Sequence, residues 1–97
     1  RWVEKRNHYI KESPTAQAEA KRLQEKAAKR AAQGNYDKAF GILKRVLELE
    51  PSNYKARRDL AMVFMEKGKT EEAKNQLIEV LGVHPNDVWS LVVLALL

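Results

Sequence analysis

Two stretches of the chain repeat each other at a spacing of 34 residues. Small, apolar and helix-ending residues recur in the same order, as the pairs Gly34/Gly68, Ala39/Ala73, Leu43/Leu77, Val46/Val80, Leu47/Leu81 and Pro51/Pro85. Alanines extend the period outward, at Ala27, Ala61 and Ala95. A fixed period of about 20 to 50 residues is typical of stacked-repeat proteins, in which each unit buries its apolar face against its neighbours. The spacing therefore predicts an array of like units that provides a binding surface and does not catalyse a reaction.

Apolar spacing and helix-ending residues predict an all-helical chain. Ala39, Leu43 and Val46 fall on one face of a helix, and Gly34 and Gly68 suit the left-handed conformation that ends helices. We expect helices over residues 1–12, 14–33, 36–49, 54–67, 70–83 and 88–97. Helix-starting residues support these bounds, namely Ser13 with Pro14, Asn53, Thr70 and Asp87. The repeated alanines are expected where neighbouring helices approach closely.

Composition limits what the chain is expected to do. Its 97 residues suit one domain, and 44% hydrophobic with 32% charged residues suits amphipathic helices. The absence of Cys excludes disulfide and thiolate chemistry. The longest apolar run, Leu91 to Leu97, is far shorter than the roughly 20 residues that span a membrane. The location stays open, with the cytoplasm favoured because no secretory signal is visible, and the start at Arg1 suggests a fragment.

The net charge of +5 lies in the first third of the chain. Residues 1–33 hold nine Lys or Arg and four Glu, whereas residues 34–97 hold nine charges of each sign. A basic segment is either a contact for nucleic acid or an anionic surface, or a solvated helix face. Only Trp2 and Tyr9 are aromatic there, and no base-reading motif is present. We therefore favour the solvated face and do not expect nucleic-acid binding.

The repeated residues resemble the tetratricopeptide repeat. The resemblance rests on Ala27 and Ala61, on the glycine turns, on Ala-x3-Leu from Ala39 and from Ala73, and on the closing prolines. It implies an all-α, right-handed superhelical array of antiparallel helix pairs. The domain would span 15–97, with repeats 20–53, 54–87 and a partial 88–97, after an N-terminal basic amphipathic helix or linker at 1–14.

One departure from the family pattern concerns the first helix of each pair. The family often places an aromatic residue seven positions after a large apolar residue, whereas this chain has Leu23 with Arg30, and then Arg57 with Phe64. The first repeat is therefore expected to be looser, or to use the N-terminal helix as a lid.

The resemblance also implies that the first helix of each pair lines a concave groove that binds a peptide or a partner helix. The expected groove residues are Lys21, Gln24, Glu25, Ala28, Ala31, Ala32, Lys55, Arg58, Asp59, Met62, Met65, Glu66, Trp89, Val92, Val93 and Leu96. Polar contacts would come from Lys55, Arg58 and Asp59. The apolar members form either an adaptable binding surface, since Met repacks around varied partners, or a face that packs against further repeats.

A known subclass of the family grips the C-terminal carboxylate of heat-shock chaperones with Lys, Asn and Arg side chains. At the corresponding positions this chain has Gln24, Ala28, Asp59, Trp89 and Val93. Because Asp59 would repel a carboxylate, we do not expect binding of chaperone tails.

Catalytic and metal-binding patterns are missing from the sequence. His8 and His84 are 76 residues apart and have no Cys to complete a metal site. No phosphate-binding loop, nucleophile motif or acid–base set is present, and no cofactor is expected. The prediction is a non-catalytic module for protein or peptide binding. The alternatives are self-assembly into a homo-oligomer, through 88–97 or the N-terminal helix, and a regulatory or scaffold appendage of a larger protein.

Overall fold

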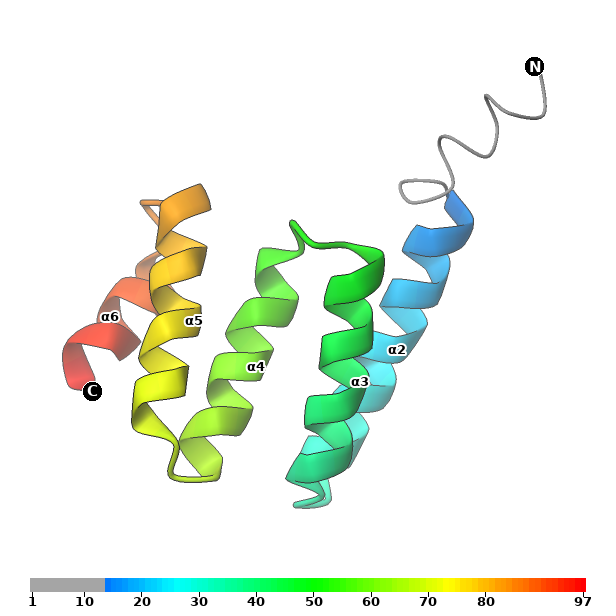
Figure 1. Ribbon diagram of the computed structural model, residues 1–97, viewed down its shortest axis with the longest axis horizontal. Coiled ribbons are helices and arrows are strands. Elements are labelled where there is room, and N and C mark those ends of the chain that lie inside the picture. Colours follow the sequence, from blue (N-terminus) through cyan, green and yellow to red (C-terminus); the bar gives the residue numbers. More distant parts are fainter. Residues whose placement is uncertain (1–13) are drawn as a thin grey trace.

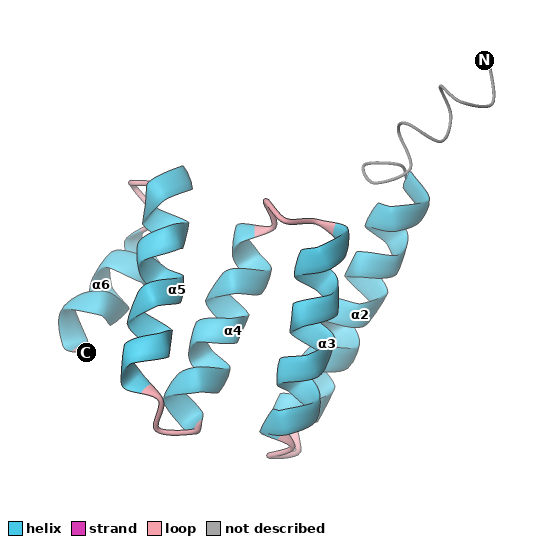
Figure 2. Cartoon of the chain, viewed as in Figure 1, coloured by secondary structure: helices cyan, strands magenta, loops and turns pink. Residues whose placement is uncertain are grey.

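The computed structural model describes residues 14–97, which form five helices joined by short loops (Figures 1 and 2). The helices are α2 (Pro14–Ala32), α3 (Tyr36–Leu49), α4 (Tyr54–Glu66), α5 (Thr70–Val83) and α6 (Val88–Leu96). Consecutive helices run antiparallel and pack in chain order, and these residues contain no strand. The predicted all-α repeat array is confirmed. The helix expected over residues 1–12 and the cap at Ser13 lie outside the described residues.

Both predicted glycine turns are confirmed. Gly34 and Gly68 have φ angles of 78° and 75°, a region that residues with a Cβ atom rarely adopt. After α2, the amide of Asn35 donates to the carbonyl of Arg30 at 2.8 Å. After α4, the amide of Lys69 donates to Phe64 at 2.8 Å. These bonds satisfy carbonyls at the helix ends that would otherwise lack partners, and they reverse the chain within a few residues.

Of the three helix caps predicted within the chain, at Asn53, Thr70 and Asp87, two are confirmed. The Asn53 side chain accepts a hydrogen bond from the amide of Ala56, and Asp87 accepts one from the amide of Ser90. The prediction that Thr70 caps α5 is wrong. Thr70 is the first residue of the helix, and the cap position belongs to Lys69, whose side chain makes no cap hydrogen bond. The turn at Gly68 closes on Lys69, so Lys69 takes the cap position, and Thr70 is the first helical residue, at the predicted start of 70.

The core is built from small and branched residues in the repeated positions. On α3 these are Ala39, Leu43 and Val46, and on α5 they are Ala73, Leu77 and Val80; all six are buried. Ala27 and Ala61 are also buried, as expected for close helix contacts. Ala95 is exposed, contrary to prediction, because no helix within residues 14–97 packs over that face of α6. Each helix within residues 14–97 is too short or too polar to span a membrane.

Candidate functional site

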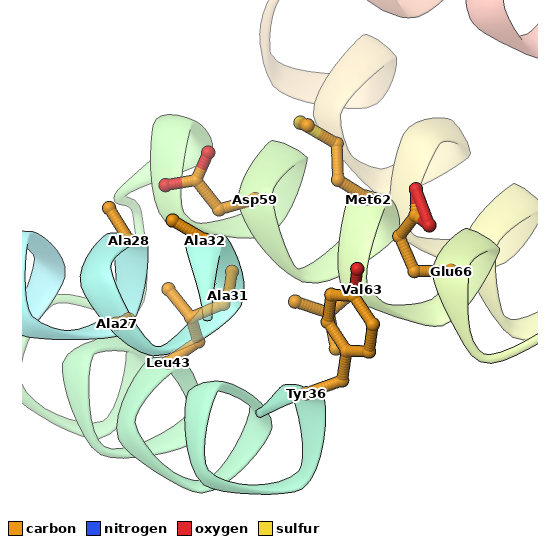
Figure 3. Close-up of a pocket in the computed structure, with 10 residues that line it drawn as sticks. All are labelled: Ala27, Ala28, Ala31, Ala32, Tyr36, Leu43, Asp59, Met62, Val63 and Glu66. Atoms are coloured by element: carbon orange, nitrogen blue, oxygen red, sulfur yellow. The ribbon is translucent and has the colours of Figure 1, made fainter. Parts of the chain in front are cut away.

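A cavity of about 330 Å³ opens between the first helices of the two complete pairs, α2 and α4 (Figure 3). We call it the alanine pocket. Its lining comes from α2, α3 and α4 and consists of Ala27, Ala28, Ala31, Ala32, Tyr36, Leu43, Asp59, Met62, Val63 and Glu66. Four alanines of α2 leave room for the cavity because a methyl group is the whole side chain. The buried Leu43 and Val63 make part of the wall apolar.

The charged residues that line the alanine pocket are both acids, Asp59 and Glu66 of α4. Burial raises the pKa of Asp59 above its ordinary value, against the hydrogen bond from Gln24 and the charge of Arg58, which lower it. The charged form of a half-buried carboxyl group of this kind is favoured by an added positive charge nearby. The pocket therefore combines an apolar wall with two acidic groups, and it suits an apolar side chain next to a cationic one.

Arg58 joins α4 to the start of α6. Its guanidinium lies 3.5 Å from a carboxylate oxygen of Asp87 and 4.7 Å above the ring of Trp89. The hydrogen bond from the Ser90 hydroxyl is the main cause that lowers the pKa of Asp87, and the charge of Arg58 adds to it. Asp87 is therefore held as a carboxylate. Arg58 and Trp89 are engaged with each other within the chain.

Gln24 joins α2 to the loop before α4. Its side-chain oxygen accepts a hydrogen bond from the Asn53 amide at 3.1 Å, and the same amide donates to Glu50 at 2.9 Å. Asn53 also caps α4 through its own oxygen. Through these contacts Asn53 links the start of α4 to α2 at one end of the pair of helices that flanks the alanine pocket.

The residues predicted for the groove fall into distinct groups. Those at the alanine pocket are Ala28, Ala31, Ala32, Asp59, Met62 and Glu66. Lys55 lies in a separate hollow at the α3–α4 loop. Exposed members outside the pocket are Lys21, Glu25, Val92 and Leu96, and half-buried ones are Met65 and Val93. The binding role of each of these residues stays a prediction.

Four lining residues were absent from the predicted groove, namely Ala27, Tyr36, Leu43 and Val63. Ala27, Leu43 and Val63 are buried, and the repeat pattern marks Ala27 and Leu43 only as core residues. Tyr36 is the first residue of α3. Its place directly after the glycine turn, at the end of α2 where Ala32 lies, is the signal that would have identified it.

A comparison with protein families matches residues 30–94 to the tetratricopeptide repeat. The chain belongs to the tetratricopeptide-repeat family. Its five helices and the paired glycine turns agree with that assignment. Members of this family are typically non-catalytic modules for protein–protein interaction. No curated protein matches the chain with significant similarity.

The histidine within the described residues has a structural place. The ring of His84 packs against that of Tyr54, with the centroids 3.9 Å apart and the planes tilted by 41°, and the backbone amide of His84 closes the end of α5. Residues 14–97 hold no cluster of three or more His, Cys, Asp or Glu that is arranged to bind a metal ion.

Proposed function

We propose that the chain is a non-catalytic interaction module that binds a peptide or helix of a partner protein in the alanine pocket between α2 and α4. The pocket itself is the observation that carries the proposal. Its volume of about 330 Å³ is at the small end of the range of roughly 300–1,000 Å³ that is usual for ligand sites. One large side chain of a partner segment fits this space. Membership of the tetratricopeptide-repeat family supports a protein as the partner.

The properties of the lining support recognition of an apolar residue beside a basic one. Met62 is 48% exposed at the pocket, and its flexible thioether adapts to different side chains. Asp59 and Glu66 supply the negative charge for a neighbouring Lys or Arg. Asp59 would also disfavour a carboxylate at this place, which agrees with the expectation that chaperone tails are not the ligand.

The test fills the pocket without disturbing the core. Ala28 and Ala18 are both exposed residues of α2, but Ala28 lines the pocket and Ala18 does not. Peptides are selected from a random displayed library on the 97-residue chain, and their affinities are measured by fluorescence anisotropy. We expect Ala28→Trp to weaken binding by about tenfold or more, which is ~1.4 kcal/mol, and Ala18→Trp to leave it unchanged.

Amide shifts in NMR spectra of the labelled chain give the location. The proposal expects selected peptides to shift Ala28, Met62 and Glu66, which line the pocket. It is refuted if the peptides leave these amides unchanged and bind Ala28→Trp as tightly as the wild type. Circular dichroism of both variants confirms that the helices are retained.

Self-assembly is a second candidate, supported by the apolar surface of α6. Val88 is 69% exposed and Leu96 80% exposed, and Leu91 and Val92 are also exposed. Contiguous apolar surface of this kind usually marks an interface. Light scattering behind a sizing column, over a wide range of concentrations, tests it. A dimer that dissociates in Val92→Glu supports self-assembly, and a monomer at every concentration excludes it.

A further inference from the structure

A second cavity, of about 430 Å³, lies between α2 and α3 and shares no lining residue with the alanine pocket. We call it the basic hollow. Its lining is Leu23, Lys26 and Arg30 from α2 with Lys38, Gly41, Ile42 and Arg45 from α3. Four of these seven residues are cationic and none is acidic. The hollow therefore combines a positive surround with two half-buried apolar side chains, Leu23 and Ile42.

Most of this positive charge has no acidic partner among residues 14–97. Arg45 pairs with Glu48 at 3.0 Å, but no carboxylate pairs with Lys26, Arg30 or Lys38. One terminal nitrogen of Arg30 donates to the neutral side-chain oxygen of Gln33 at 3.1 Å, and the buried Arg30 Nε has no hydrogen-bond partner. A buried donor without a partner is unfavourable. A ligand that brings carboxylates would be attracted by these unpaired cations.

The repeat shows what kind of object fits this surface. Counting 34 residues on from Leu23, Lys26, Arg30 and Ile42 gives Arg57, Leu60, Phe64 and Gln76. These four residues line the corresponding surface of the second pair, formed by α4 and α5, and the rest of that lining comes from α3, namely Phe40, Lys44, Leu47 and Glu48.

Helix α3 therefore covers in the second pair the surface that the basic hollow presents in the first. Phe40 of α3 packs on Phe64 with ring centroids 5.5 Å apart. The corresponding position in the first pair is Arg30, and no helix among residues 14–97 covers it. The surface has the shape on which a helix packs. Its chemistry has changed, because Leu60 and Phe64 are replaced by Lys26 and Arg30.

We propose that the basic hollow binds an acidic amphipathic helix of a partner protein. The helix lies against α2 and α3 as α3 lies against α4 and α5. Its apolar side chains contact Leu23 and Ile42, and its carboxylates pair with Lys26, Arg30 and Lys38. This site is separate from the alanine pocket, so the chain has two binding surfaces of opposite charge.

Two other occupants fit the chemistry less well. The chain's own residues 1–13 hold four Lys or Arg and two Glu, so their net positive charge is repelled by the hollow. Nucleic acid would be attracted by the cations, but the lining has no aromatic side chain on which a base stacks, and Leu23 and Ile42 would gain no apolar contact.

The test uses the full 97-residue chain and a fluorescent helical peptide built from Glu, Ala and Leu, with Leu along one face. A matched peptide carries Lys in place of Glu. We expect the Glu peptide to bind and to shift the amides of Leu23, Arg30 and Ile42, and the Lys peptide not to bind. Ala28→Trp, which fills the alanine pocket, should leave this binding unchanged. Failure of this proposal is therefore distinguishable from failure of the proposal that a partner binds in the alanine pocket.

Charge-reversal pairs separate a site from general attraction. Lys26→Glu with Lys38→Glu reverses two exposed lysines of the hollow, and Lys44→Glu with Lys69→Glu reverses two exposed lysines elsewhere. The first pair should weaken binding of the Glu peptide about tenfold or more relative to the second. Equal weakening by both pairs overturns the proposal. So does displacement of the Glu peptide by a peptide with the sequence of residues 1–13, or by a single-stranded oligonucleotide at equal concentration.

Discussion

Leu77 and Ile78 are neighbours on α5, and they allow a direct test of how the array is held together. Leu77 is fully buried, at 0% exposure, whereas Ile78 is 56% exposed. Replacing a fully buried Leu with Ala costs about 2–5 kcal/mol, because the transfer of the side chain from water is lost and a cavity remains. For Ile78 less than half of the side chain is withdrawn from water, so Ile78→Ala should cost roughly 1 kcal/mol or less.

The assay is urea unfolding followed by circular dichroism of the helices. With an unchanged slope against urea, a loss of about 3 kcal/mol in Leu77→Ala lowers the midpoint strongly, and it lowers Tm by roughly 12–24 °C for a domain of this size. Ile78→Ala keeps the same helix with the same number of carbons removed, so it is the matched control. If Leu77→Ala lowers the free energy of unfolding by no more than Ile78→Ala does, the conclusion that Leu77 stabilises the core is refuted.

Three further predictions concern backbone and charge. Gly68→Ala should lower the free energy of unfolding in urea by about 1–2 kcal/mol, because the φ of 75° at Gly68 disfavours a Cβ atom. Gly41→Ala inside α3 should raise this free energy by about 0.5–1 kcal/mol. A change in the same direction in both variants would contradict the prediction. Because burial raises the pKa of Asp59, the stability of the wild type relative to Asp59→Asn should rise as the pH falls from neutral through that raised pKa, and level off below the ordinary pKa. Because hydrogen bonding lowers the pKa of Asp87, the wild type should lose stability relative to Asp87→Asn as the pH falls below the ordinary pKa towards the lowered one. Stability is measured against pH for the wild type and both variants. If the Asp59 and Asp87 comparisons do not change in opposite directions with falling pH, both assignments are contradicted.

The helix bounds could be predicted because they depend on local chemistry. A left-handed residue is needed wherever a helix reverses within a few residues, and Gly34 and Gly68 are the residues that supply it. The one error at an interior helix start concerns the cap of α5, which was predicted at Thr70. Two residues compete for the cap position, and the hydrogen bond from Lys69 to Phe64 decides between them; this bond depends on the geometry of the whole turn.

The site was less accessible to sequence reasoning because it depends on distances between helices. The repeat indicates that Ala28 and Met62 face the same side, but the space between them depends on the distance between α2 and α4, which a sequence pattern does not contain. The contact of Arg58 with Trp89 joins residues 31 positions apart, and the repeat pattern predicts both residues only as separate groove positions. The cations of the basic hollow were visible as a charged helix face, but the cavity between α2 and α3 was not.

The carboxylate of Asp87 has a consequence for the order in which the chain folds. One of its oxygens accepts the hydrogen bonds from Ser90 that start α6, and the other faces Arg58 of α4. The first turn of α6 therefore forms as it docks on α4, and its amides should lose protection from hydrogen exchange when the contact with Arg58 opens.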